Sequence, residues 1–115
     1  VWLLTSVSDQ RSADALVPEL LKHREFVPVL GLSVEPMVGS VDLRTFLPRL
    51  DWVIVGGESG PHYRKVDVSA ICSVAYQCEK AGVPCYVKQD AHRLSEQQGR
   101  IPDAAWAIKQ HPQVV

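Results

Sequence analysis

Residues 51–61 read DWVIVGGESGP, a short apolar run followed directly by a glycine-rich turn that carries one carboxylate. Residues 51–55 have the composition of a buried parallel strand, because the run is apolar on both of its faces. In α/β folds, ligands bind where parallel strands end. This stretch therefore predicts a parallel sheet and also the edge of that sheet at which a site would lie.

Three further segments have the composition of strands: residues 2–7, 26–34 and 84–87. Residues 26–34 are apolar throughout, as in a strand of a sheet that is covered on both faces. Helical segments lie between the strands. The alternation predicts an α/β fold in which four parallel strands alternate with helices, followed by a helical C-terminal tail over residues 102–110. Such a chain is half of a (β/α) barrel or a small open sheet, and we expect residues 1–115 to form one domain.

The first helical segment contains a proline. Residues 13–23 place Leu16, Leu20 and Leu21 on one apolar stripe, but Pro18 lies within it. An interior proline costs about 3 kcal/mol relative to alanine. We therefore expect one turn of helix, and then a second piece that has Pro18 near its first position.

Of the next two helical segments, only the second has clear capping residues at its ends. Residues 42–50 have the apolar spacing of a short helical connection. Asp67 is a good N-cap for the helix that follows, and Gly82 stands where a left-handed residue would end it. The polar residues 92–99 are expected to form a loop.

Composition excludes several classes of protein. The net charge of −1 leaves no basic surface for nucleic-acid backbones, so we expect no nucleic-acid partner. No apolar run is long enough to span a membrane, and we see no signal peptide. The three cysteines, Cys72, Cys78 and Cys85, match no zinc spacing, and their odd number favours a reducing, cytoplasmic location. We expect them to be small buried side chains.

Polar residues and glycines follow the ends of three predicted strands. We predict that they form a ligand-binding rim made of Ser33, Glu35, Gly56, Gly57, Glu58, Ser59, Lys88 and Gln89. Two carboxylates, a lysine and glycine-flanked amides could bind a polar small molecule there. No catalytic triad, phosphate-loop or metalloprotease pattern is present, so we assign no catalytic residue and no metal ligand.

Structural interpretations of the same residues stay open. Glu35 and Lys88 could simply form an ion pair across the rim, and Glu58 could cap backbone amides in its own loop. Gly56 and Gly57 could only relieve crowding where the strand turns. We expect the three tryptophans, Trp2, Trp52 and Trp106, to lie in the core.

Beyond these patterns, the chain resembles a widespread phage and prophage protein family of unknown function. The longest matching stretch is residues 51–61. Other matching stretches are VWL and SV near the N-terminus, LSVEPMVG at residues 32–39, AGVP at residues 81–84, KQ at residues 88–89, GR at residues 99–100, and Trp106. One departure is Asp90-Ala91, which stands where the family has Trp-Gly after Lys-Gln.

Members of that family resemble radical S-adenosylmethionine proteins, in which a cysteine cluster in the N-terminal half holds a 4Fe–4S centre in a partial barrel. The resemblance covers only the C-terminal half of such proteins, and no C-x3-C-x2-C spacing is present here. It implies a half-barrel whose rim would bind cofactor or substrate. S-adenosylmethionine is the cofactor that the resemblance suggests, and we expect none to be used by this chain alone.

Three hypotheses follow. In the first, the chain is a non-catalytic half-barrel that binds a polar small molecule. In the second, it is the substrate- or cofactor-binding half of a split radical enzyme and needs a cluster-bearing partner chain. In the third, it is a structural homodimer, whose two copies cover each other's open sheet edges, or a remnant of a mobile phage-type gene.

Overall fold

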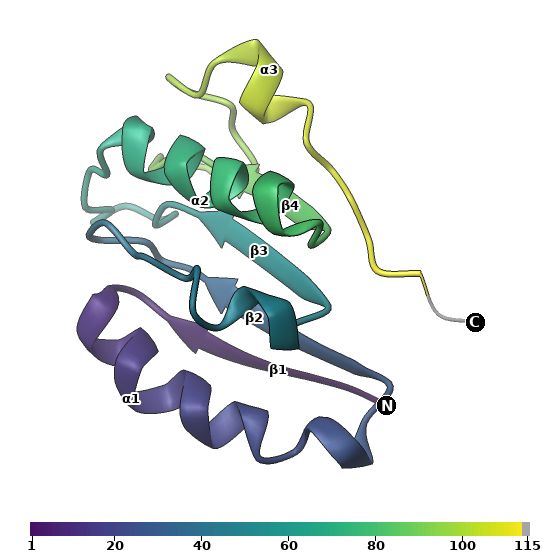
Figure 1. Ribbon diagram of the computed structural model, residues 1–115. Helices are drawn as coiled ribbons and strands as arrows, with labels where there is room; N and C mark the ends of the chain where they lie inside the picture. Colours follow the sequence, from purple (N-terminus) through teal and green to yellow (C-terminus); the bar gives the residue numbers. More distant parts are fainter. Residues whose placement is uncertain (114–115) are drawn as a thin grey trace.

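The computed structural model describes residues 1–113 and contains one four-stranded sheet in which all strands are parallel (Figure 1). The strands lie in the order β1 (Trp2–Val7), β2 (Val29–Val34), β3 (Trp52–Gly56) and β4 (Cys85–Gln89). The helices are α1 (Gln10–Leu21), α2 (Val68–Ala81) and α3 (Asp103–Trp106), with 3-10 turns η1 (Arg24–Phe26) and η2 (Leu47–Arg49). The predicted α/β alternation around a parallel sheet is confirmed.

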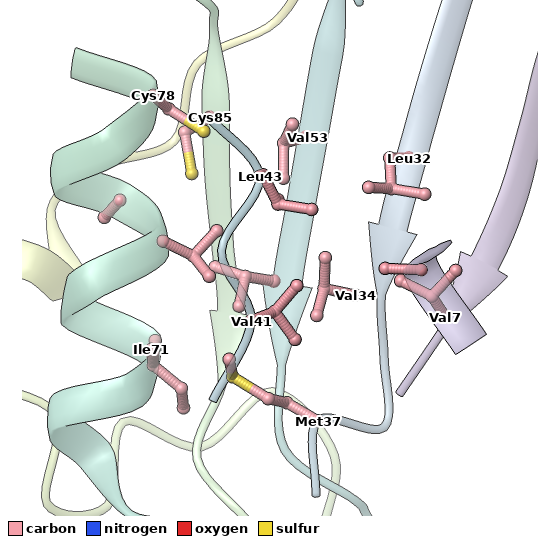
Figure 2. Packing of buried hydrophobic residues seen from close by; sticks show 14 of the residues in the cluster. Val7, Leu32, Val34, Met37, Val41, Leu43, Val53, Ile71, Cys78 and Cys85 are labelled. Carbon is pink, nitrogen blue, oxygen red and sulfur yellow. The ribbon is translucent and has the colours of Figure 1, made fainter. Parts of the chain in front are cut away.

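One face of the sheet forms the core. Val7, Val34, Val55 and Val87 lie next to one another in register across the four strands, and all are buried. The residues two positions away on β2, β3 and β4 continue the same face and pack against the buried sides of α1 and α2 (Figure 2). This layer stabilises the chain because it removes a continuous apolar surface from water.

Neither α1 nor α2 packs on the opposite face, which we call the open face. Its side chains are Trp2, Leu4 and Ser6 of β1, Val29 and Ser33 of β2, Trp52 and Ile54 of β3, and Tyr86 and Lys88 of β4. Trp2 is 43% exposed and Leu4 is 38% exposed. The strand expected to be covered on both faces, β2, is buried at five of its six residues, whereas β1 is exposed on the open face.

The predicted second strand begins too early. Phe26 lies in η1 and is 77% exposed, and β2 starts only at Val29. The amide of Phe26 donates to the carbonyl of His23, which closes a turn. Pro28 lacks a backbone N–H and cannot extend the ladder, so the strand starts after it.

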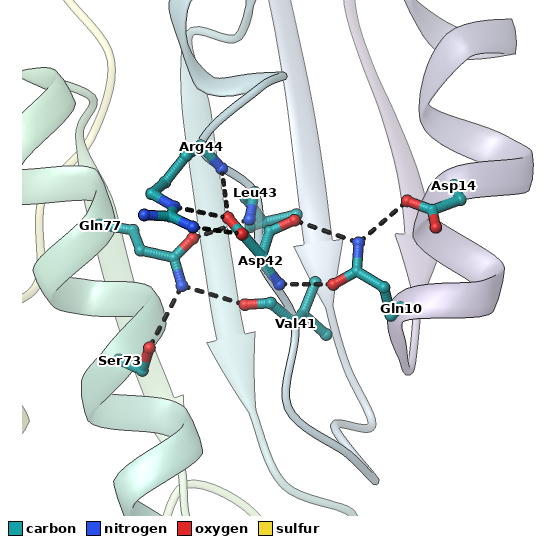
Figure 3. Close-up of polar contacts among 8 residues, drawn as sticks. All are labelled: Gln10, Asp14, Val41, Asp42, Leu43, Arg44, Ser73 and Gln77. Atoms are coloured by element: carbon teal, nitrogen blue, oxygen red, sulfur yellow. Dashed lines mark hydrogen bonds and ion pairs between the residues drawn. The ribbon is translucent and has the colours of Figure 1, made fainter.

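The predicted helix over residues 42–50 is reduced to η2, because side chains hold the loop that precedes it (Figure 3). Gln77 Oε1 accepts from the amide of Leu43 at 2.7 Å, and Gln77 Nε2 donates to the carbonyl of Val41 at 3.0 Å. Gln10 Oε1 accepts from the amide of Asp42 at 2.6 Å. These bonds hold residues 41–43 in a non-helical path before η2, and Pro48, which has no backbone N–H, cannot make the hydrogen bond that a continuous helix would need there.

The first helix is continuous, contrary to the prediction of two pieces. Pro18 is exposed within α1, so its ring faces water while the residues around it still pack on the sheet. The buried residues of α1 are Ala13, Val17, Leu20 and Leu21, whereas Leu16 is 42% exposed. Burial on both sides of the proline offsets the hydrogen bond that it cannot make.

The second helix begins and ends as predicted. The Asp67 side chain accepts from the amide of Ser69 at its start, and Gly82 ends it in the left-handed conformation with φ of 72°. Residues 92–99 form a loop without helix or strand, as predicted. Throughout residues 1–113, no helix combines the length and apolar character that crossing a membrane requires.

The predicted C-terminal helix is a single turn, α3. After it the chain is extended and runs beside β4: the amide of Val87 donates to the carbonyl of Ile108, and the amide of Gln110 donates to the carbonyl of Cys85, both at 2.9 Å. This antiparallel contact covers the β4 edge of the sheet. At the other edge, β1 pairs only with β2 among residues 1–113.

Candidate functional site

Three of the predicted rim residues meet at the carboxyl ends of β2 and β4. Glu35 follows β2 directly, and its Oε1 accepts from Lys88 Nζ at 2.9 Å and from Gln89 Nε2 at 3.4 Å. The register of β3 and β4 shifts between Val55 and Gly56, which sets Gly56 opposite Gln89. The ion pair considered from the sequence is therefore present, and it lies on the open face.

Gln89 connects this group to the loops above it. Its side chain is buried, donates to the carbonyl of Gly57 at 2.7 Å and accepts from the amide of Glu96 at 2.8 Å. Glu96 is a non-glycine residue with a positive φ, 58°. Such a conformation is uncommon and persists where surrounding contacts hold it. Gln89 thus fixes the position of the Glu96 backbone.

Gly57 is required by the chain itself. A Cβ at this position would lie 2.4 Å from the amide nitrogen of Ala91. The Gly57 amide donates to the carbonyl of Gln89 at 3.0 Å, so it is used within the fold. The close approach of the Gly57 and Ala91 backbones is thus a sufficient reason for glycine at position 57.

Glu58 and Ser59 belong to a separate contact in the loop after β3. Glu58 Oε1 accepts from the amide of Arg64 at 2.8 Å, and its two oxygens accept from the Arg64 guanidinium at 3.0 Å. These bonds lower the pKa of Glu58. The backbone of Ser59 forms an isolated parallel β-bridge with the backbone of His92. Glu58 therefore caps a backbone amide of its own loop, which is one of the interpretations that the sequence left open.

A pocket of about 320 Å³ lies against the open face, next to the Glu35–Lys88 pair. Its lining residues are Glu35, Trp52, Ile54, Tyr86, Lys88, Glu96 and His111. Only Glu35 and Lys88 of the predicted rim line it. Ser33 lies on the same face, in register with Ser6 and Ile54.

Aromatic rings form part of the wall of this pocket. The His111 ring lies 5.5 Å from the Trp52 ring and 5.4 Å from the Tyr86 ring, between centroids. Trp52 Nε1 donates to the carbonyl of Gln110 at 2.9 Å, which holds the tail beside the ring. The prediction of Trp2 and Trp52 as core residues is wrong, since both lie on the open face.

Five lining residues were missed by sequence reasoning: Trp52 as a site residue, Ile54, Tyr86, Glu96 and His111. Strand alternation carries a signal for Tyr86, because Tyr86 and Lys88 are two residues apart and therefore share a face. Glu96 and His111 have no such signal, since a loop and the extended tail bring them to the pocket.

The three cysteines do not form a metal site. Cys78 and Cys85 are buried next to each other in the core, and Cys72 is partly buried on α2 (Figure 2). A hydrogen bond with Cys85 and burial raise the pKa of the Cys78 thiol. Within residues 1–113, no three His, Cys, Asp or Glu side chains are grouped as metal ligands. These residues do not fit an iron–sulfur cluster.

The family described as protein of unknown function (DUF5131) matches residues 1–109. The chain belongs to this family. That description names no activity, ligand or partner for its members. No curated protein and no solved structure matches the chain, so the geometry of the open face is the basis for a functional assignment.

Proposed function

We propose that this chain binds a polar small molecule on the open face of its sheet, in a pocket that extends from Trp52 to the carboxyl ends of β2 and β4, and does not catalyse a reaction by itself. The observation that carries the proposal is the pocket of about 320 Å³ whose wall contains the Glu35–Lys88 pair. Its volume lies in the range of small-molecule sites. Ligand binding at strand carboxyl ends is the general rule for parallel sheets.

The same proposal includes the half-barrel. The half-barrel is supported by four parallel strands in sequential order with helices packed on one face, as in consecutive (β/α) units of a barrel. S-adenosylmethionine enters as a candidate ligand only through the family resemblance. The pocket offers aromatic rings and both signs of charge, which suit an adenine ring and an amino-acid group.

The test is two-dimensional NMR of the ¹⁵N-labelled chain, titrated with a set of polar small molecules that includes S-adenosylmethionine. We expect shifts to gather at Lys88, Gln89 and the Trp52 indole N–H, and Glu35→Gln to weaken binding. Shifts that scatter over other surfaces, or their absence at millimolar concentration, would refute the proposal.

A matched control lies at the opposite end of the sheet. Like Glu35, Asp51 forms an ion pair, in this case with Arg24 at 2.5 Å. Asp51 also accepts a hydrogen bond from the amide of Leu30 at 2.8 Å. Asp51→Asn should lower stability and leave ligand affinity unchanged. If Glu35→Gln and Asp51→Asn weaken binding equally, the effect comes from the fold and not from the pocket.

A second candidate function is self-association through β1. This edge strand, WLLTSV, carries no charge or proline of the kind that protects exposed edges. In an antiparallel, two-fold pairing, Leu4 would face Leu4 of a second copy and Trp2 would face Ser6, which keeps the open-face side chains on one face. The pairing would join two sheets into one of eight strands.

A further inference from the structure

The chemistry of the pocket changes along the strands. Trp52 lies at the start of β3, and Tyr86 pairs in register with Ile54 in the middle of the sheet. Lys88 and Glu35 lie at the carboxyl end, beyond these apolar side chains. Two residues along a strand correspond to about 6.6 Å, which is close to the length of one aromatic ring with a short substituent.

The polar end of the pocket offers both signs of charge. Lys88 uses one of its N–H donors on Glu35, which leaves further donors for an anion. The side-chain carboxylate of Glu96 makes no hydrogen bond or ion pair within the part of the chain that the structure describes, while its backbone is held by Gln89. The Lys88 ammonium, held by Glu35, and the exposed carboxylate of Glu96 thus both line the pocket.

The remaining nearby cation is already engaged. Lys109 Nζ lies 3.5 Å from the centroid of the Trp106 ring and 5.0 Å from that of Tyr86, and it donates to the carbonyl of Val87. Burial lowers the pKa of its ammonium group. Lys109 is not among the residues that line the pocket, so Lys88 is the lysine that can receive an anion there.

From this arrangement we infer that the pocket recognises a zwitterion with a flat ring, of the aromatic amino-acid class. The ring would lie against Trp52, Tyr86 and His111, the ligand carboxylate would meet Lys88, and the ligand ammonium would meet Glu96. Offset or edge contacts between aromatic rings stabilise such a position, and charge-assisted hydrogen bonds fix the head group. The inference rests on the proposed function and narrows its ligand class.

Four probes separate the parts of the ligand. L-tryptophan has the ring and both charges, tryptamine lacks the carboxylate, indole-3-propionate lacks the ammonium, and L-alanine lacks the ring. Affinities are measured by calorimetry, and the site is located by the NMR signals of the Trp52 indole N–H and Lys88. We expect L-tryptophan to bind at least about fivefold more tightly than each of the other three probes.

Two substitutions each remove one of the two pocket charges that would meet the ligand head group. Lys88→Met should weaken L-tryptophan and indole-3-propionate and leave tryptamine unchanged. Glu96→Gln should weaken L-tryptophan and tryptamine and leave indole-3-propionate unchanged. Glu79→Gln, an exposed glutamate on α2, serves as the control, and urea denaturation verifies that each variant is folded.

The outcomes distinguish this inference from the proposed function. If tryptamine, indole-3-propionate or L-alanine binds the pocket as tightly as L-tryptophan, the zwitterion class is wrong while the pocket remains a ligand site. Variants that weaken all probes equally also overturn the inference. If none of the four probes and none of the polar set described above perturbs Trp52 or Lys88, both the inference and the proposed function fail.

Discussion

At the scale of single residues, Gly57 has little room for change because backbone atoms surround it. A Cβ there would meet the backbone of Ala91, with its nitrogen at 2.4 Å and its Cα at 2.8 Å. Because backbone atoms cannot rotate away as a side chain can, Gly57→Ala should destabilise the fold by about 1–3 kcal/mol. Urea denaturation followed by tryptophan fluorescence measures the loss.

Gly39→Ala is the matched control. The nearest atom to a Cβ at Gly39 is Asp9 Cβ at 3.8 Å, an ordinary contact. This substitution should leave stability unchanged or raise it slightly, because alanine restricts the unfolded chain. Equal stability of the two variants would show that the approach between Gly57 and Ala91 is looser than described here.

At the scale of elements, α1 contains a residue that destabilises the helix. Pro18 lies in the middle of the helix, where it removes a backbone hydrogen bond. Pro18→Ala should stabilise the chain by about 2 kcal/mol, since an interior proline costs about 3 kcal/mol and its stiffening of the unfolded chain returns up to about 1 kcal/mol. The free energy of unfolding in urea is the measurement.

Pro48→Ala tests whether the gain belongs to the helix interior. Pro48 lies in the first turn of η2, where proline is compatible with the backbone. This variant should be no more stable than the original chain. A loss of stability in Pro18→Ala would mean that the ring contributes contacts with residues such as Phe46 that outweigh the missing hydrogen bond.

The elements differ in how well the sequence predicts them, for reasons that lie in their contacts. The β3 strand and α2 follow from local information: an apolar run in one case, and the Asp67 cap with Gly82 in the other. The segment over residues 42–50 does not, because Gln10 and Gln77, each more than 30 residues distant, hold its backbone. Local propensity yields there to tertiary hydrogen bonds.

The same distinction applies to the site at the scale of the whole molecule. Glu35 and Lys88 could be predicted to lie close together, because ends of parallel strands meet at one edge. Glu96 and His111 could not, since one depends on a bond to the buried Gln89 and the other on the path of the tail past Trp52. The open face itself follows from topology, which composition does not determine.

Within residues 1–113, the tail covers the β4 edge of the sheet and the β1 edge pairs with no further strand, and this asymmetry predicts a dimer. If β1 pairs with β1 of a second copy, light scattering coupled to size exclusion should give twice the mass of the chain. Leu4→Lys should convert it to a monomer, since two lysines would face each other at the two-fold axis. Tyr76→Lys, at an exposed tyrosine on α2, should remain dimeric. A chain that stays monomeric at high concentration would refute the pairing, and its free edge would then be available to a strand from a different protein.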